Sequence, residues 1–291
     1  FFVLFLSKAI AEPTFVQSKS IAAAAYYGLT FNNDGTKMYT VHSGGNTDGV
    51  VEYILTSAYD ISTATLNTSK VVHRGGNSGF HVPTQVVFNN DGTKMFIVNH
   101  AGVKTIDYWS LSTAFEISTA TFDVAYSIAG QEIRANSIAF NNDGTRMFVA
   151  GVGNESQHRI HEYSLDTAFD LSSGVTHLNS EDLNSFHSYI DGVTFNHDGT
   201  KMYTIDTTDN QISQFKLTTP YDVSTLSLEG TFDVSSVQEA PRQIAFSHDG
   251  SKMFFIVNTD NAATGKVHEF NLSCNWSVID GACDDPADTS D

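Results

Sequence analysis

Charged, amide and aromatic residues occur at matching places along this chain, each four residues ahead of a recurring Phe: Tyr27, Thr84, Asn136, Asp191 and Arg242. Further polar residues stand close to them, namely Glu132, Arg134, Tyr189, Glu239 and Gln243. Together they suit a polar ligand such as a glycan or peptide, hydrogen-bonded by the amides and charges and stacked on Tyr27 or Tyr189. The alternative is that these groups satisfy loop backbones and one another.

Two of these residues are acids that could perform hydrolysis. Glu132 and Asp191 could serve as the carboxylates that flank a glycosidic bond, one as acid and one as base or nucleophile. The chain contains no Ser-His-Asp or Cys-His signature. An extracellular hydrolase, a glycosidase or a lactonase, is therefore the alternative to a binding function, and no catalytic residue is assigned.

The eleven histidines raise the question of a metal site. Those in variable loops are scattered along the chain: His42, His81, His100, His158 and His187. The only short spacing, between His158 and His161, puts the two side chains on opposite faces of a strand. We therefore predict neither a metal site nor a cofactor. His197 and His248 replace an Asn of the repeated turn and are interpreted as turn residues.

A nine-residue pattern, Phe-x-x-Asp-Gly-Thr/Ser-Lys/Arg-Met-Tyr/Phe, occurs at Phe31–Tyr39, Phe88–Phe96, Phe140–Phe148, Phe195–Tyr203 and Phe246–Phe254. Its aspartates are 57, 52, 55 and 51 residues apart, which indicates one supersecondary unit repeated around a ring or solenoid. The Asp-Gly pair between β-forming runs predicts a tight hairpin. The pattern lacks the further carboxylates of a calcium loop, so the Asp is interpreted as turn chemistry.

Each hairpin is followed by a third strand, as in Val50/Tyr53/Leu55, whose spacing predicts burial on both faces. A phrase such as Ala58–Thr63, with an aromatic and an aliphatic two apart, then leads into a fourth strand. Five units of four strands predict an all-β, five-bladed β-propeller. The last unit lacks its fourth strand, and the segment after Thr14 matches that strand of the second unit, so we expect the N-terminal strand to complete the last blade.

The hairpin turns and the Ala-aromatic-Asp phrases are nearly constant and are predicted to share one face, the scaffold face. The remaining connections vary in length and chemistry and form the opposite, variable face, where ligands of repeat proteins bind.

The chain has 15 basic and 33 acidic residues, a net charge of −18. Such an excess repels phosphate backbones and anionic lipid surfaces, so nucleic acid is excluded as a partner. No segment is long enough for a stable membrane span.

The ends of the chain indicate a secreted or cell-surface location. Residues 1–11 begin with the apolar run Phe1–Leu6 and end in Ala9-Ile10-Ala11, like a signal-peptide remnant. The alternative is a retained apolar strand that joins copies of the chain into a homo-oligomer or filament. Residues 12–278 are assigned to the propeller and 279–291 to an acidic tail. Cys274 and Cys283 are predicted to form a disulfide, with free buried thiols as the alternative.

The repeated phrase resembles the F-S-P-D-G-x-x-φ-Y/F-V repeat of extracytoplasmic propellers of the TolB-like and YVTN types, with Asn or His where those have Pro. The resemblance implies the fold and an extracytoplasmic location, in a class whose members include binding scaffolds, surface-layer proteins and lactonases. The function we predict is a non-catalytic recognition or assembly module.

Overall fold

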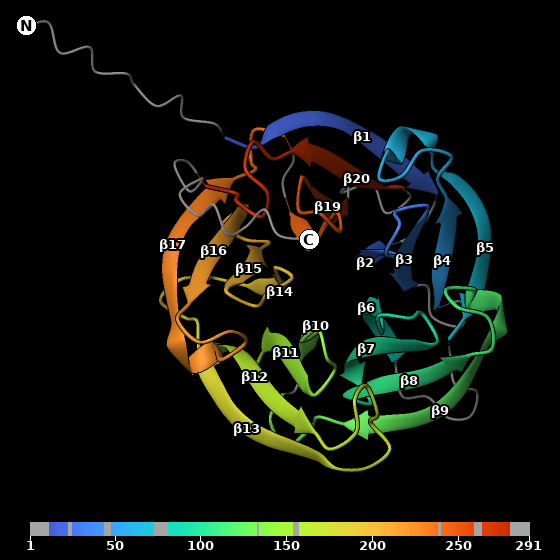
Figure 1. Cartoon of the computed structure of the whole chain (residues 1–291), viewed down its shortest axis with the longest axis vertical. Coiled ribbons are helices and arrows are strands. Elements are labelled where there is room, and N and C mark those ends of the chain that lie inside the picture. Colours follow the sequence, from blue (N-terminus) through green and yellow to red (C-terminus); the bar gives the residue numbers. More distant parts are fainter. Residues whose placement is uncertain are drawn as a thin grey trace, which may run out of the picture.

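The computed structural model is a ring of five four-stranded antiparallel sheets, the architecture of a β-propeller (Figure 1). It describes residues 12–22, 25–43, 48–72, 81–132, 134–153, 157–237, 240–258 and 264–279. In each blade the strands follow one another from the centre of the ring to its rim. The prediction of an all-β, five-bladed propeller is confirmed.

The strand boundaries repeat from blade to blade. The first blade consists of β2 (Ala25–Phe31), β3 (Lys37–Ser43), β4 (Gly49–Ile54) and β5 (Thr65–Val71). The second consists of β6 (His81–Phe88), β7 (Lys94–Gly102), β8 (Thr105–Leu111) and β9 (Ala120–Ser127). The third consists of β10 (Ala135–Phe140), β11 (Arg146–Val152), β12 (His158–Leu165) and β13 (Val175–Asp182). The fourth consists of β14 (Ile190–Phe195), β15 (Lys201–Asp206), β16 (Gln211–Leu217) and β17 (Leu226–Asp233). The fifth consists of β18 (Pro241–Phe246), β19 (Lys252–Asn258), β20 (Thr264–Asn271) and β1 (Thr14–Ala22).

The fifth blade takes its outer strand from the other end of the chain. β1 pairs antiparallel with β20, from Thr14 opposite Asn271 to Ala22 opposite Thr264. Figure 1 shows β1 lying along β20 at the rim. The predicted closure is therefore present, and it removes the free edges that β1 and β20 would otherwise expose.

Each hairpin turn is held by its own aspartate. Asp34 Oδ1 accepts hydrogen bonds from Thr36 N–H at 2.9 Å and from Thr36 Oγ1 at 2.6 Å, and Gly35 has a φ of 69°. The other four turns repeat this bond to a backbone N–H two residues on. The aspartates thus serve the turns, as the Asp-Gly pattern predicts.

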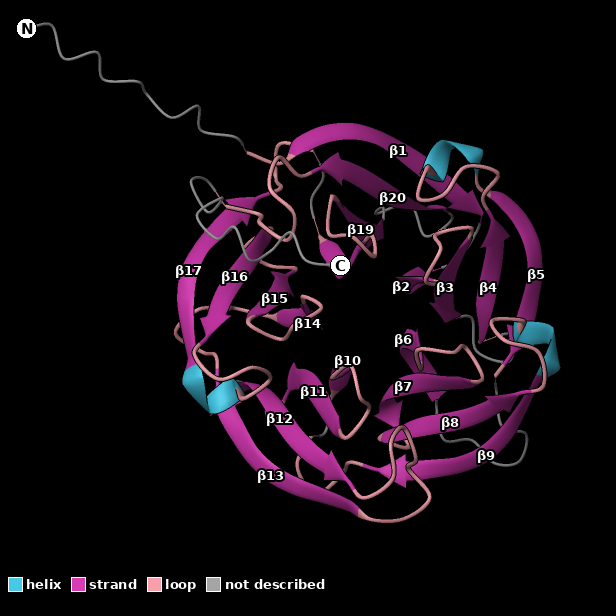
Figure 2. Ribbon diagram, viewed as in Figure 1, coloured by secondary structure: helices cyan, strands magenta, loops and turns pink. Residues whose placement is uncertain are grey.

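In each blade an aromatic residue of the loop between the third and fourth strands packs against the glycine of the hairpin turn. Tyr59 N–H donates to Gly35 O at 2.9 Å, and a Cβ on Gly35 would lie 2.3 Å from the Tyr59 ring, so only glycine fits. Equivalent aromatics, all with φ between 54° and 59°, are Tyr59, Phe115, Phe169, Tyr221 and Trp276. In three blades a short 3-10 turn follows, η2 (Ile61–Thr63), η3 (Ile117–Thr119) and η4 (Val223–Thr225), drawn at the rim in Figure 2.

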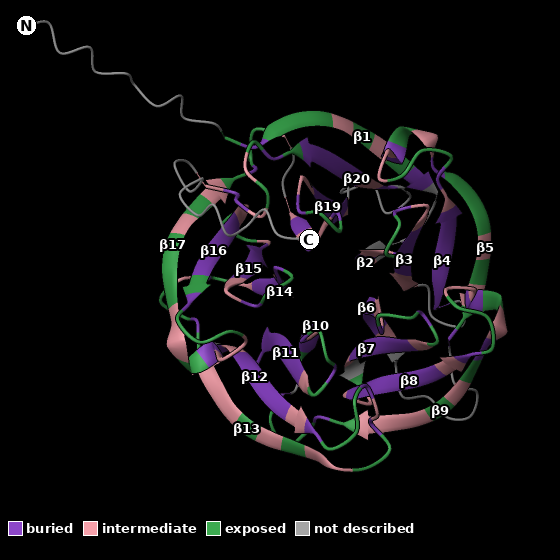
Figure 3. Ribbon diagram, viewed as in Figure 1, coloured by how far each residue is buried: buried purple, intermediate pink, exposed green. Residues whose placement is uncertain are grey.

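The core lies between the blades in five clusters of buried side chains. Each repeated Phe packs against the aromatic that ends the preceding repeat, with ring centroids 4.6–4.7 Å apart. In Figure 3 buried residues fill the inner strands, and exposed residues lie mainly on the outer ones. Burial of apolar surface between sheets therefore holds the ring together.

The lysines of the repeat also join neighbouring blades. Lys37 Nζ donates to Phe115 O at 3.2 Å, and Lys252 Nζ donates to Tyr59 O at 3.2 Å. Lys252 also pairs with the buried Glu269 at 2.7 Å. Lys37 and Lys252 are thus inter-blade links, whereas Arg146 at the same position of the third repeat pairs with Glu162 of its own blade.

Closure of the ring can be tested on β1. Ile21 is buried with Leu29 and Phe254 between the fifth and first blades, so Ile21→Ala should lower the free energy of unfolding by about 2–4 kcal/mol through the lost contacts. Val16 on the same strand is 41% exposed, so Val16→Ala should change stability by no more than about 0.5 kcal/mol. Guanidinium unfolding of the full chain measures both, and equal effects would contradict the closure.

A buried histidine predicts acid sensitivity. His268 is 3% exposed, its ring stacks on Phe255 with centroids 5.0 Å apart, and neither ring nitrogen has a hydrogen-bond partner in the described residues. Burial, helped by Lys266, lowers the pKa of His268 from 6.5 to about 4. The unfolded chain takes up this proton first as the pH falls. Stability is therefore full above pH 6.5 and falls by about 3 kcal/mol towards pH 4.

His268→Phe should flatten this part of the stability-versus-pH curve, because the variant has no proton to take up at this position. Urea unfolding between pH 4 and 7 measures the effect, and Val16→Ala, which removes no titratable group, should retain the slope of the parent protein. A slope left intact in His268→Phe would show that other groups cause it.

Candidate functional site

Three side chains meet across the centre of the ring. They come from the position three residues ahead of each repeated Phe, which is occupied by Gly28, Gln85, Ser137, Gly192 and Gln243. Ser137 Oγ donates to Gln85 Oε1 at 2.9 Å, and Gln243 Nε2 donates to Ser137 Oγ at 3.1 Å. A Cβ on Gly192 would lie 2.3 Å from Gln243 Oε1, so glycine makes room for the amide. We call Gln85, Ser137 and Gln243 the plug.

A β-bulge lies next to the plug in every blade. The pairing of each innermost strand with its neighbour shifts register between Tyr26 and Leu29, Pro83 and Gln85, Ala135 and Ser137, Ile190 and Gly192, and Pro241 and Gln243. In four blades the residue inside the shift is the one four ahead of the repeated Phe, and in the first blade both Tyr27 and Gly28 lie inside it. Because a bulge re-aims the side chain of the extra residue, it brings the predicted ring of polar residues to one mouth of the channel.

These bulge residues line a cavity of about 180 Å³ together with neighbours from the variable face. Its lining consists of Tyr27, Val82, Thr84, His100, Asn136, Tyr189, Asp191 and Arg242. We call it the variable-face pocket. Pockets for drug-sized ligands span about 300–1,000 Å³, so this one suits a smaller group such as one sugar ring or one side chain.

An ion pair crosses the pocket between the fourth and fifth blades. Arg242 Nη1 lies 3.1 Å from Asp191 Oδ2, and the Arg242 guanidinium carbon lies 5.8 Å from the centroid of the Tyr27 ring. The guanidinium is thus held by a carboxylate and an aromatic face. Burial raises the pKa of Asp191 to about 7, although Arg242 acts to lower it. The carboxyl can therefore gain or lose a proton near neutral pH.

The hydrogen bonds of Asn136 fix the tautomer of His100. Asn136 Nδ2 donates to Ile190 O at 2.8 Å, which leaves its Oδ1 to accept from His100 Nδ1 at 2.6 Å. Burial lowers the pKa of His100, so its imidazole is neutral at pH 7. A neutral ring that carries its proton on Nδ1 has Nε2 as a hydrogen-bond acceptor.

The Tyr189 side of the pocket is anchored by a buried carboxylate. Asp206 Oδ2 accepts from Ser188 N–H at 2.7 Å and from Tyr189 N–H at 2.9 Å. Burial acts to raise the pKa of Asp206, but hydrogen bonds from His187 and backbone N–H groups outweigh it and lower the pKa to about 2. Asp206 therefore stays ionised and holds the backbone at Tyr189 in place.

The structure brings together five of the predicted ligand-binding residues: Tyr27, Asn136, Tyr189, Asp191 and Arg242. Glu132 and Arg134 do not line this pocket. Glu132 is fully buried, where it accepts from Arg134 N–H at 2.8 Å and lies 3.6 Å from His161 Nε2, and the Arg134 side chain is exposed. Among the described residues of the lining, Asp191 is the one acid. Gln243 belongs to the plug, and Glu239 lies outside the described residues.

Two lining residues were not predicted to be in the pocket. The sequence pattern predicted His100 on the variable face only, and it did not indicate Val82. Val82 precedes the repeat of the second blade and His100 follows it, and neither position has a matching residue type in the other blades. Among the described residues no group of three or more His, Cys, Asp or Glu is arranged to hold a metal ion.

Comparisons with known proteins establish the fold alone. No known family model matches the chain, and no curated protein sequence matches it. A luciferin-regenerating enzyme is similar in structure, with 13% identity, a TM-score of 0.51 and coverage of 89% of this chain and 95% of that one. A candidate 6-phosphogluconolactonase from Bacteroides fragilis has 14% identity, a TM-score of 0.48 and coverage of 87% and 69%. A functionally unknown protein from Desulfotomaculum acetoxidans has 14% identity, a TM-score of 0.48 and coverage of 87% and 67%.

The class of protein is thus a β-propeller, and at such identities a shared fold carries no activity with it. The resemblance of the repeat to TolB-like and YVTN-type propellers stays a prediction.

Removal of the pocket arginine should shift the titration of the pocket acid. Arg242 lowers the pKa of Asp191, so Arg242→Leu should raise that pKa further above 7, by about one unit or more. Carbon-13 NMR of the aspartate carboxyls across pH 5–9 measures the shift. Arg146→Leu, which removes an arginine paired with Glu162 instead, should leave Asp191 unchanged. An unchanged Asp191 titration in Arg242→Leu would contradict the pairing.

Proposed function

We propose that this propeller is a non-catalytic recognition module that binds a small polar ligand, a glycan or a peptide side chain, in the variable-face pocket. One observation carries the proposal: a guanidinium, a carboxyl, a neutral imidazole and two tyrosines from different blades line one small cavity. The five bulges lie at equivalent positions, but their side chains are chemically different. Because blade architecture would favour the same residue in every blade, this variety supports a role in ligand recognition.

The pocket offers both hydrogen-bonding directions and aromatic faces. The Arg242 guanidinium donates, His100 Nε2 accepts, and the Asp191 carboxyl does either according to its protonation. Tyr27 and Tyr189 present ring surfaces on which a sugar ring can stack. Sugar hydroxyls need such paired donors and acceptors, because a buried hydroxyl left unsatisfied costs about 1–3 kcal/mol.

A secreted or cell-surface location belongs to this proposal and rests on the sequence. Phe1–Ala11 and Cys283 lie outside the described residues, so the signal-peptide remnant and the Cys274–Cys283 disulfide stay predictions, as does assembly into an oligomer or filament through Phe1–Leu6. Within the described ranges, the chain forms no helix with the length and apolarity needed to cross a bilayer.

The alternative function is an extracellular hydrolase, a glycosidase or lactonase, and Asp191 is the observation that favours it. A carboxyl with a pKa of about 7 has the value that a general acid needs at neutral pH. Glycoside hydrolysis uses a second carboxylate about 5–10 Å away, and the part of the pocket lining that the structure describes includes no second acid. The binding function is therefore the better supported of the two.

The proposal can be tested on an array of immobilised glycans and short peptides. The parent protein should bind one class of probe, and Tyr27→Ala and Arg242→Ala should each weaken that binding by about tenfold or more, through the lost stacking and hydrogen bonds. Arg134→Ala removes an exposed arginine that does not line the pocket, and it should bind like the parent protein. Equal loss in Arg134→Ala would place the site elsewhere.

The same protein incubated with nitrophenyl glycosides and lactones should release no product. Turnover that disappears in Asp191→Asn would overturn the non-catalytic assignment in favour of the hydrolase.

A further inference from the structure

The opposite mouth of the channel holds a second cavity, of about 260 Å³, on the scaffold face. Its rim is formed by the third residue of each repeat: Asn33, Asn90, Asn142, His197 and His248. We call this cavity the scaffold mouth. Because the plug lies between the two mouths, a ligand here would be independent of the variable-face pocket.

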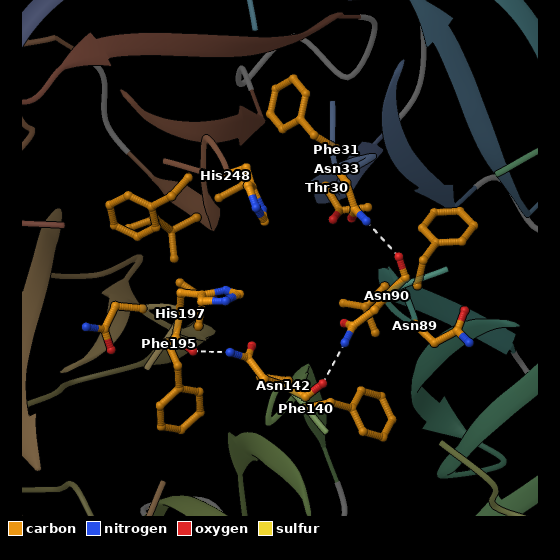
Figure 4. A pocket seen from close by; sticks show the side chains of 18 of the residues that line it. Thr30, Phe31, Asn33, Asn89, Asn90, Phe140, Asn142, Phe195, His197 and His248 are labelled. Carbon is orange, nitrogen blue, oxygen red and sulfur yellow. Dashed lines mark hydrogen bonds between the residues drawn. The ribbon is translucent and has the colours of Figure 1, made fainter. Parts of the chain in front are cut away.

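Three asparagines of the scaffold mouth form a hydrogen-bonded series that runs from blade to blade. Asn33 Nδ2 donates to Asn90 O at 2.6 Å, Asn90 Nδ2 donates to Asn142 O at 2.5 Å, and Asn142 Nδ2 donates to His197 O. Figure 4 shows these bonds around the opening. Because each partner is a carbonyl, the amide nitrogen must face it, which leaves all three amide oxygens as acceptors.

The series ends where His replaces Asn. The His197 and His248 rings point into the same opening (Figure 4), with centroids 5.6 Å apart. The backbone of both is fixed, because His197 O accepts from Tyr221 Oη at 2.8 Å and His248 N–H donates to Tyr59 Oη at 3.1 Å. A metal bound about 2.1 Å from an imidazole nitrogen lies about 3 Å from the ring centroid, so two rings at this separation can flank one ion.

The side chains at the rim of the scaffold mouth suit a cation. The amide oxygens of the three asparagines and the nitrogens of the two imidazoles carry lone pairs, which are the groups that coordinate metal ions. The lining contains no lysine or arginine among the described residues.

We propose that the scaffold mouth binds one divalent transition cation of the Zn²⁺ type through His197 and His248, with water and rim oxygens in the remaining positions. Imidazole pairs select such ions over Ca²⁺ and Mg²⁺, which take oxygen ligands alone. The ion would join the fourth blade to the fifth at the place where the asparagine series is interrupted. Two histidine ligands give a weaker site than a structural zinc centre with four protein ligands.

Isothermal titration of ZnCl₂ into the full-length, tag-free protein after chelator treatment tests the proposal. One zinc ion should bind, and His197→Asn and His248→Asn should each weaken that binding by about tenfold or more. Both variants restore the residue of the first three blades, so the fold is kept. Asn142→His adds an imidazole beside His197 and should tighten the site by about tenfold.

His177→Asn is the matched control, because His177 also lies near a second imidazole, with its ring centroid 5.8 Å from that of His161, but on an outer strand. It should leave zinc binding unchanged. Zinc bound equally by the parent protein and by the double variant His197→Asn/His248→Asn would overturn the proposal, as would no binding at all. Calcium chloride titrated in place of zinc should give no heat from this site.

Discussion

The ring depends on one repeated contact, the aromatic pair between neighbouring blades. Each nine-residue repeat begins with a Phe and ends with a Tyr or Phe, and the two face opposite neighbours. Every blade therefore has one aromatic side chain packed against each of its two neighbours. The series closes where Phe31 of the first blade packs against Phe254 of the fifth, with ring centroids 4.7 Å apart. Strand β1 reinforces the same junction from the rim. A ring closed in this way has no end blade, so no apolar blade face remains to be covered.

This contact also separates the positions that must be constant from those that can vary. The Phe, Asp-Gly, Lys and terminal aromatic of each repeat pack between blades or form turns, and their chemistry hardly changes. The residues three and four ahead of the Phe lie at the centre of the ring, where their contacts with other blades are made by side chains around the channel, such as Ser137 with Gln85 and Arg242 with Asp191. The residues four ahead of the Phe differ in every blade and line the variable-face pocket, whereas the position three ahead carries only Gly, Gln or Ser and supplies the plug.

Much of this could be predicted from the sequence, because the repeat fixes strand order, turn position and the strand that closes the ring. Tyr27, Asn136, Asp191 and Arg242 were predicted to meet because they share one register. Glu132 and Arg134 lie in a connection that does not share this register. The Glu132 side chain is buried and accepts a hydrogen bond from Arg134 N–H, and the sequence spacing does not predict this direction. The hydrogen bonds of the plug could not be predicted, because Gln243 reaches Ser137 across two blades that are not adjacent, and the repeat does not indicate which blades meet at the centre.

The plug fixes the walls of the variable-face pocket, which supports the recognition function proposed for it. Each bulge residue is followed directly by a plug position, so Thr84, Asn136 and Arg242 are joined by one peptide bond to Gln85, Ser137 and Gln243. Ser137 Oγ also accepts from Val193 N–H at 2.9 Å, two residues beyond Asp191. The hydrogen bonds that close the channel therefore fix the backbone of the pocket in four blades at once. A pocket whose walls are set before the ligand arrives loses little conformational entropy on binding, so a few polar contacts suffice for selective recognition.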